Sequence, residues 1–411
     1  MGKERIFAMS TMKLREGVWS VGVLNPSMRV FDVVMKAPYG TSYNAYLLTG
    51  EKNVLIDTVH LDYWEEFEEN IRQVLPLEKL DYLIMDHTEP DHSGSVARLL
   101  DRCPNLQILC SNSAKKFLAS IANREVPCTV VKDGDTLSLG DKTLHFISAP
   151  LLHWPDTMFT WDPADSILFT CDFLGAHFCE PSLWDTGIHT KHREAYEGQL
   201  KNYYDCIFSP FKPSVLSGLS KIPPETKLVC PSHGPILSEL LPHVMELFQE
   251  WSTPVSGVGK TAGILYTTAY GCTEALAKAA ADALDAEGFQ VTMIDLTYAP
   301  IESSYELVNT ADVLLFGSPT INRAAPPAIW GAIHAVDAIN TRGRSAAAFG
   351  SYGWSGEAPD MLLTHLSKLK FKTPETPFRV CFVPTEDDLS AMADYARQTA
   401  ALAKVSASAN A

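Results

Sequence analysis

The sequence predicts a protein of mixed α and β structure in two parts, the first built on two sheets and the second on one. Before residue 250, strand-like and helix-like segments alternate but hairpins are mixed in, which favours two sheets with helices outside. From Ala262 onwards, apolar strands are each followed by a helical pattern, as in a doubly wound parallel sheet. Residues 252–261 are rich in Pro, Gly, Ser and Thr and lack apolar periodicity. We therefore expect domains at 1–251 and 262–411, joined by a linker at 252–261.

The composition is that of an ordinary globular protein. Hydrophobic residues make up 46% and charged residues 20% of the 411 positions, and no apolar run is long enough to span a membrane. The first residues carry charge without a long apolar stretch behind them, so we expect no secretory signal. A formal net charge of −16 disfavours nucleic acid as a partner, because phosphate contacts need clustered Lys and Arg.

The nine cysteines are scattered and form no C-x-x-C pair. An odd, unpaired set is typical of a reducing compartment, so we expect a cytoplasmic protein. The spacing also excludes a rubredoxin-type iron centre within the chain, since that centre needs closely paired cysteines.

The apolar pattern predicts the elements of the first part in order. Residues 20–60 are strand-like and include a hairpin, NAYLLTG-EKN-VLIDT. A helix is expected at 61–76, then the strands DYLIMDH and LQILC, a helix near 112–122, and the strands CTVV and LSLGDKTLHFISAP. MFTWDPADSILFTCDF predicts a second hairpin that turns at Asp162 to Asp165. Helices follow at 190–220, and KLVCPSHGP supplies the last strand.

The stretch LIMDHTEPDHSGS at 83–95 holds four potential metal ligands within six residues, His87, Glu89, Asp91 and His92. They follow an apolar strand and precede a Ser-Gly-Ser helix start, which predicts a loop at the carboxyl end of a buried strand. Open sheets present their chemistry at that end. In an extended loop alternate residues share a face, so His87, Glu89 and Asp91 would point together and His92 to the other side. One loop could therefore serve two adjacent metals.

Three more potential ligands stand at predicted strand ends. His153 follows LHFISAP, Asp172 closes the strand ILFTC, and His233 follows KLVCP. A carboxylate at the end of a buried strand is costly unless it is paired or bound to a metal. One His at such a position is usually structural, but strand ends that meet at one sheet edge can bring all these side chains together, which favours a metal site.

The second part reads as five strands, AGILYTT, FQVTMIDL, ADVLLFGSPT, RSAAAFGSY and FRVCFVPT, with helices at 273–287, 326–339, 357–369 and 384–405. The first strand ends in a loop whose hydroxyls and backbone N–H groups, at a helix N-terminus, suit a phosphate. The loop has no Lys and no Walker ending, so we do not expect a nucleoside triphosphate. Its residues are Thr267, Thr268, Ala269, Tyr270, Gly271, Cys272 and Thr273.

The third and fourth strands of the second part end in two further loops, GSPTIN and GSYGWSG. Together with the phosphate loop they resemble flavodoxin, which implies FMN, with Tyr352 and Trp354 as aromatic walls of the flavin ring. The residues expected to contact the ring are Pro319, Thr320, Ile321, Asn322, Ser351, Tyr352, Gly353, Trp354 and Gly356.

The ligand series of the first part resembles that of the metallo-β-lactamase superfamily, with one departure. Glu89 stands where the zinc hydrolases of that superfamily have His. Carboxylate ligands favour iron, since anionic oxygen stabilises the ferric as well as the ferrous state. A lactamase-like part with this Glu, followed by a flavodoxin-like part, resembles the two-domain flavodiiron proteins. The resemblance implies a metallo-β-lactamase-like αββα sandwich followed by a flavodoxin-like five-stranded parallel sheet.

The same resemblance implies two irons and a ligand set. It assigns His87, Glu89 and His153 to one iron, Asp91, His92 and His233 to the other, and Asp172 as the bridge, with water in place of His92 as an open alternative. Tyr203 or Tyr204, within the predicted helices, is a candidate hydrogen-bond donor to a bound oxygen species.

The implied activity is reduction of dioxygen to water, of nitric oxide to nitrous oxide, or of both. Electrons would come through FMN from an external donor, a rubredoxin or a reduced deazaflavin. In this family the flavin of one chain meets the diiron site of another, so we expect a head-to-tail homodimer or a dimer of such dimers. Two alternatives stay open at this point: a zinc-dependent hydrolase with a flavodoxin-like docking module, and an electron carrier or redox sensor whose metal half is only a scaffold.

Overall fold

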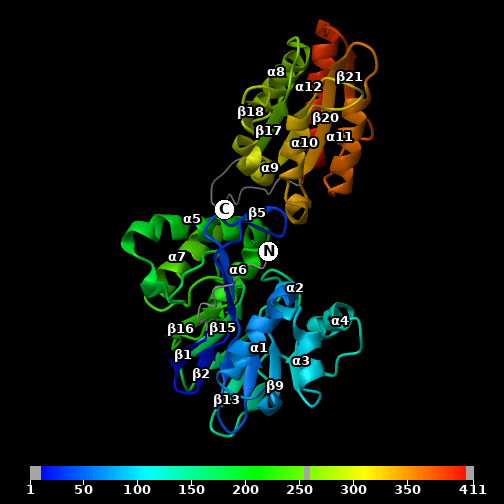
Figure 1. Ribbon diagram of the computed structural model, residues 1–411. Helices are drawn as coiled ribbons and strands as arrows, with labels where there is room; N and C mark the ends of the chain where they lie inside the picture. Colours follow the sequence, from blue (N-terminus) through cyan, green and yellow to red (C-terminus); the bar gives the residue numbers. More distant parts are fainter. Residues whose placement is uncertain (1–10, 254–259, 404–411) are drawn as a thin grey trace, which may run out of the picture. The chain divides into compact units, whose positions relative to one another are not determined.

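The computed structural model describes residues 11–253 and 260–403 (Figure 1). The chain divides into two compact units between Thr253 and Pro254. Most of the predicted linker lies outside the described residues. Helix α7 (Leu241–Ser252) precedes that gap and strand β17 (Thr261–Tyr266) follows it. No helix within the described ranges is both long enough and apolar enough to cross a membrane.

The first unit is built on two sheets, as the sequence predicts. The larger has seven strands in the order β1 (Met12–Arg15), β2 (Val18–Ser20), β7 (Tyr46–Leu48), β8 (Val54–Ile56), β9 (Tyr82–Met85), β10 (Gln107–Cys110) and β11 (Cys128–Val130). The smaller has five, β12 (Thr136–Ser138), β13 (Thr143–Ser148), β14 (Met158–Asp162), β15 (Ile167–Cys171) and β16 (Leu228–Pro231). The two predicted hairpins are the antiparallel pairs β7–β8 and β14–β15. Two short ribbons stand apart, β3 (Val23–Asn25) with β6 (Thr41–Tyr43) and β4 (Val30–Phe31) with β5 (Met35–Lys36).

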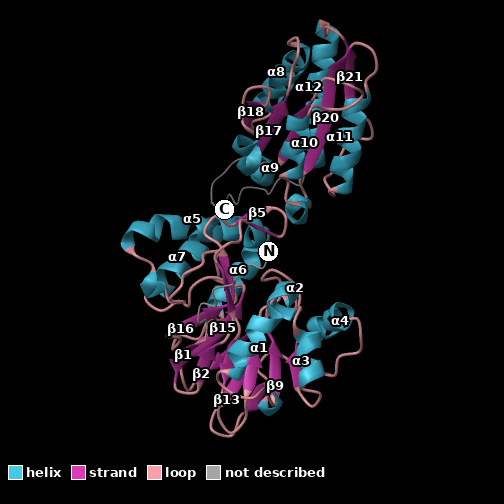
Figure 2. Cartoon of the chain, viewed as in Figure 1, coloured by secondary structure: helices cyan, strands magenta, loops and turns pink. Residues whose placement is uncertain are grey.

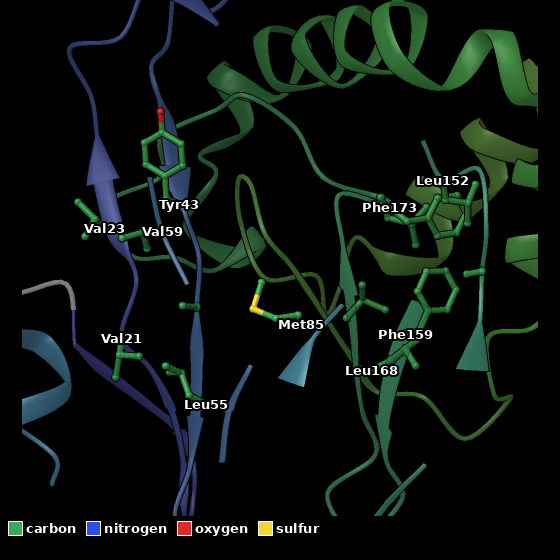
Figure 3. Packing of buried hydrophobic residues seen from close by; sticks show 14 of the residues in the cluster. Val21, Val23, Tyr43, Leu55, Val59, Met85, Leu152, Phe159, Leu168 and Phe173 are labelled. Atoms are coloured by element: carbon green, nitrogen blue, oxygen red, sulfur yellow. The ribbon is translucent and has the colours of Figure 1, made fainter. Parts of the chain in front are cut away.

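Alternation along the strands explains how the two sheets and the helices pack. On β8, Val54 and Ile56 belong to a core that also contains Phe146 and Phe169 of the smaller sheet, whereas Leu55 belongs to a second core. Helices contribute apolar residues to this second core, part of which is drawn in Figure 3. They are α1 (Trp64–Arg72), α3 (Val96–Arg102), α4 (Asn112–Ile121), α5 (Arg193–Tyr203), α6 (Lys212–Ser220) and α7.

The second unit is a parallel sheet with helices on both faces (Figure 2). Its five strands run in the order β18 (Gln290–Asp295), β17, β19 (Val313–Gly317), β20 (Ser345–Tyr352) and β21 (Phe378–Cys381), all parallel. On β17, Ile264 packs with α8 (Cys272–Ala286) and α12 (Glu386–Leu402), whereas Leu265 packs with α9 (Tyr305–Thr310), α10 (Pro327–His334) and α11 (Glu357–Lys368). The order reverses beside β17, and ligands of such sheets bind outside the carboxyl ends of the strands at that point.

Several elements differ from the predictions. The helix expected at 326–339 is α10 followed by a separate 3₁₀ turn at Ala338–Thr341, because the Asp337 side chain accepts from the backbone N–H of Ile339 at 2.9 Å and starts a new turn. The helix expected at 61–76 is a 3₁₀ turn at Leu61–Tyr63 followed by α1, which ends at Arg72. Strand β1 and helix α7 were not predicted, and α9 is the helix expected, without bounds, after the second strand of the second part.

Candidate metal centre and flavin loops

The loop after β9 is extended only as far as Glu89. Pro90 then occupies the first position of the short helix α2 (Pro90–Ser93), where its missing N–H is not needed. The expectation that Asp91 shares an extended face with His87 and Glu89 was therefore wrong, because Asp91 and His92 lie on a helical turn. That turn brings Asp91 to the other group of ligands, with its Oδ2 2.9 Å from His233 Nε2.

The seven candidate ligands form two adjacent groups. Ligand atoms of His87, Glu89, His153 and Asp172 all lie within 4.8 Å of one another, and so do those of Asp91, His92 and His233. His87 follows β9 by two residues, Asp172 directly follows β15, and His233 follows β16 by two residues. His153 lies farther from its strand, in the loop between β13 and β14. Strand ends of both sheets therefore meet at one edge of the unit.

Asp172 stands between the two groups, with one carboxylate oxygen toward each. Its Oδ2 lies 3.4 Å from the Nε2 atoms of His87 and His153. Its Oδ1 lies 3.2 Å from His92 Nε2 and 3.5 Å from His233 Nε2. A carboxylate placed in this way can bind two cations at once, one through each oxygen.

Two of the histidines are oriented by a partner on the far side of the ring. His87 Nδ1 lies 3.2 Å from Asp156 Oδ2, an oxygen that also accepts from the Thr88 backbone N–H and hydroxyl. His233 Nδ1 lies 2.6 Å from the Ser42 carbonyl oxygen. A His that binds a metal usually makes a hydrogen bond through its other ring nitrogen. Here the contacts occupy Nδ1 of each ring and leave Nε2 to face a metal. His92 Nδ1, in contrast, has no hydrogen-bond partner among the described residues.

The electrostatics of the centre suit a cation. Burial lowers the pKa of His92, but Asp91 and Asp172 outweigh it and raise that pKa to about 9. Burial also lowers the pKa of His153, but Asp172 and Glu89 outweigh it and raise that pKa to about 9. Both carboxylate oxygens of Asp91 are buried and face imidazole nitrogens, His233 Nε2 at 2.9 Å and His92 Nε2 at 3.2 Å, without a hydrogen bond to any described residue. Buried acceptors of this kind need a donor or a metal, so the residues fit a pair of cations.

The two candidate tyrosines separate. The Tyr203 hydroxyl donates to Asp172 Oδ1 at 2.9 Å, and the residue is 1% exposed. Burial, then Asp172, keeps the pKa of Tyr203 well above its usual value, so the phenol holds its proton. Tyr204 turns away from the centre: its hydroxyl lies 2.8 Å from Ser252 Oγ and its ring packs on Phe248. The structure brings only Tyr203 to the candidate ligands.

Three residues near the centre were not identified from the sequence. Asp156 lies in the same loop as His153, and this proximity was its only signal. His177 is buried, with its ring centroid 4.8 Å from that of His233 and 4.9 Å from that of Tyr203. Asp32, on the turn between β4 and β5, hydrogen-bonds Glu89, and burial followed by that contact raises the pKa of Asp32 to about 7. No local pattern marks His177 or Asp32, because their contacts come from distant segments.

The phosphate loop predicted in the second unit lies between β17 and α8. Gly271 has φ +79°, a left-handed conformation that Gly adopts without strain, and α8 begins at the next residue. The Thr268 hydroxyl accepts from the Gly271 N–H at 3.0 Å, and the hydroxyls of Thr273 and Ser351 lie 2.9 Å apart. The Thr267 hydroxyl is buried and has no hydrogen-bond partner within the described ranges, which fits a phosphate oxygen as its missing partner.

The two predicted ring loops follow β19 and β20 at the same sheet edge. Asn322 has φ +52° and the Ile321 N–H donates to the Ala324 carbonyl, so the first loop turns back tightly. Trp354 in the second loop is 98% exposed, and Phe382 beyond β21, which was not predicted, is 62% exposed. Exposed aromatic side chains grouped at one edge mark a binding surface. A planar flavin ring is the kind of group they suit.

Comparisons with known proteins agree for the two units. The model of the "ODP family beta lactamase" matches residues 41–234, and that of flavodoxin matches residues 264–394. The "Flavo-diiron protein FprA2" of Clostridium acetobutylicum is 45% identical over 93% of this chain and 96% of its own. A protein named "Nitric oxide reductase" from Moorella thermoacetica is 31% identical, over 94% of this chain and 98% of its own. Among solved structures, rubredoxin oxygen:oxidoreductase from Desulfovibrio gigas has a TM-score of 0.69 at 29% identity, covering 95% of this chain and 98% of its own.

Proposed function

The chain belongs to the flavodiiron proteins, oxidoreductases with FMN and a diiron centre, and we propose that it reduces dioxygen to water, nitric oxide to nitrous oxide, or both. One observation carries the proposal: each oxygen of Asp172 faces a different group of ligands. Family membership also removes the two alternatives raised from the sequence, a zinc hydrolase and a carrier with an idle scaffold.

We assign the ligands by the two groups. His87, Glu89 and His153 would hold one iron, Asp91, His92 and His233 the other, and Asp172 would bridge them. When bound, the irons and the flavin supply the electrons for the reduction, four for dioxygen to water and two for coupling of nitric oxide. In the second unit, the phosphate loop (267–273) and the ring loops (319–322 and 351–356) would hold FMN.

The protein's own contribution is to bury the ligands and to hold them in position. Five of the seven ligands are buried, and Asp156 and Ser42 fix two of the rings, so the centre is shaped before a substrate arrives. Tyr203 keeps its proton and acts as a hydrogen-bond donor rather than as a base. In this proposal it is a hydrogen-bond donor for a substrate held at the centre.

Surface features support a head-to-tail homodimer, or a dimer of such dimers. The turn that carries Asp32 to Glu89 exposes Val33 to 93% and Val34 to 80%. The flavin loops expose Trp354 to 98%. Apolar groups exposed at both functional edges suit a contact between the metal edge of one chain and the flavin edge of another.

Subunit mixing tests this arrangement. Asp172→Ala removes the bridge, and Gly271→Val puts a β-branched residue where φ is +79°. Each variant alone should be inactive, but a mixed dimer should recover activity because one metal edge still meets one intact flavin edge. Absence of recovery in a purified mixed dimer would refute the head-to-tail contact.

The donor and the compartment complete the proposal. A rubredoxin is the expected external donor, in keeping with the name of the Desulfovibrio gigas neighbour, and a reduced deazaflavin is the second candidate. All nine cysteines are free, which supports a reducing, cytoplasmic location.

Turnover measurements test the function itself. Dioxygen and nitric oxide consumption should be measured with iron- and FMN-loaded protein and each of several reductants, alongside metal analysis. We expect two irons and one FMN per chain and turnover with at least one of the two gases. Protein that carries zinc at full occupancy after growth with ample iron would contradict the proposal.

A further inference from the structure

Two cysteines lie side by side at the edge of the seven-stranded sheet. Cys110 ends β10 and Cys128 begins β11, the edge strand. The parallel register pairs Ile108 with Cys128 and Cys110 with Val130. Since alternate residues of a strand share a face, the two cysteines are diagonal neighbours on one face of the sheet. Their thiols are close enough for each to shift the pKa of the other.

The two thiols differ in access. Cys110 is fully buried, whereas Cys128 is partly exposed and lines an open cavity of about 500 Å³. Lys115 and Glu125 line the same cavity. Cys110 is not among the residues that line this cavity, so a small molecule that enters it reaches Cys128 first.

The two thiols also differ in pKa and therefore in reactivity. The neighbouring Cys110 thiol is the largest cause that holds the pKa of Cys128 below its usual value, and the pKa of the buried Cys110 lies above its own. The Lys115 ammonium acts in the same direction on Cys128. A thiol with a lowered pKa beside a positive charge and open to solvent is the reactive kind, because the thiolate is the nucleophile. Cys110, buried and protonated, suits the part of the second, resolving thiol.

We propose that Cys110 and Cys128 form a dithiol that reacts with hydroperoxides, with Cys128 as the attacking and Cys110 as the resolving cysteine. The Cys128 thiolate attacks one peroxide oxygen, the O–O bond breaks, and the products are Cys128 sulfenic acid and hydroxide, which takes a proton to become water. The Cys110 sulfur then attacks the Cys128 sulfur, the S–O bond breaks, and a second water leaves with the Cys110 proton. The two thiols lose two electrons to form one disulfide, and the peroxide gains them.

Formation of this bond requires a movement of the edge strand. A disulfide needs the two Cα atoms closer than diagonal neighbours usually stand. Strand β11 has only three residues and pairs on one side only, so it can shift toward β10 without breaking a second ladder. The two thiols supply both electrons and the peroxide accepts them, so the reaction needs neither irons nor flavin.

Peroxide titration of the oxidised holoenzyme tests the proposal, since oxidised cofactors cannot supply the electrons. After substoichiometric hydrogen peroxide, peptide mass spectrometry should find a Cys110–Cys128 disulfide. Cys128 should be consumed about tenfold faster than Cys206 or Cys381, which are exposed but have no neighbouring thiol. In Cys110→Ser protein, a sulfenic-acid trap such as dimedone should label Cys128 instead.

Matched variants separate this chemistry from general oxidation. Cys103→Ser removes another buried thiol and should leave the disulfide yield unchanged, whereas Cys128→Ser should abolish it. Oxidation of Cys206 or Cys381 as fast as Cys128, or a Cys128 sulfenic acid that never resolves in the unsubstituted protein, would overturn the proposal.

Discussion

The metal centre and the flavin loops both lie at the carboxyl ends of strands. They differ in which parts of the residues form them. The metal centre gathers side chains from strand ends of two sheets, and Asp172 at its middle is 2% exposed. The flavin loops come from neighbouring strands of one sheet and leave Tyr270 95% and Trp354 98% exposed. The first site depends on which side chain stands at each position. The second depends on backbone conformation and hydroxyls, so single substitutions should act very differently on the two.

The largest effect is expected from Asp172→Ala. Because each oxygen of this carboxylate faces one group of candidate ligands, its loss should remove both irons and all turnover, while the flavin stays bound. Metal analysis and the flavin absorbance of the purified variant measure the two sites separately. Asp205→Ala, on the surface, is the control and should keep both cofactors. An Asp172→Ala protein with two irons would show that the bridge is not needed.

A smaller loss is expected from Asp156→Asn. The amide keeps the size of the side chain but removes the charge that faces His87 Nδ1, so the His87 ring is held less firmly. Iron affinity should fall by about 10- to 100-fold, as for other partners of ligating histidines. Competition with a chelator measures this, and an unchanged affinity would mean that packing alone orients His87.

On the flavin side, Thr267→Val should have a moderate effect. If the buried Thr267 hydroxyl binds the phosphate, its loss should raise the Kd for FMN by about tenfold without changing the iron content. The flavin-free protein should be no less stable, because Val removes a buried hydroxyl that has no partner there. Flavin fluorescence titration gives the Kd, with the exposed Thr310→Val as control. Equal affinities in the two variants would place the phosphate elsewhere.

The smallest effect is a pH dependence of the metal-free protein. The pKa values of His92 and His153 are about 9 in the fold, above the ordinary 6.5. Protonation of these residues therefore stabilises the metal-free fold fully below pH 6.5, and that stability is lost as the pH rises through 9. Thermal unfolding of the metal-free protein should show a falling Tm over this window, whereas the iron-loaded protein should not. A flat profile without metal would contradict the assigned charges.

Much of this organisation could be predicted from the sequence because it is written in local patterns. Apolar runs followed by His87, Asp172 and His233 marked strand ends, and strand ends meet at sheet edges. The conformation of Asp91 was mispredicted because one Pro90 turned an extended loop into a helical turn. That information was local, but the strand pattern before it dominated the prediction.

Other parts of the site carry no local signal. The Ser42 carbonyl reaches His233 across 191 positions of sequence, and any residue could supply that oxygen. Tyr203 and Tyr204 are adjacent and chemically alike, and only tertiary packing decides that the first faces Asp172 while the second faces Ser252. His177 is a single buried His, which composition cannot distinguish from an ordinary core residue.

The hydrogen bond from Tyr203 to Asp172 has one more consequence. A phenol has a single hydrogen to share, and this one is already committed to Oδ1. A gas molecule that accepts a hydrogen bond from Tyr203 must therefore first break the hydrogen bond between Tyr203 and Asp172 Oδ1. Substrate binding and the loss of this hydrogen bond to Asp172, the residue between the two ligand groups, would then occur together.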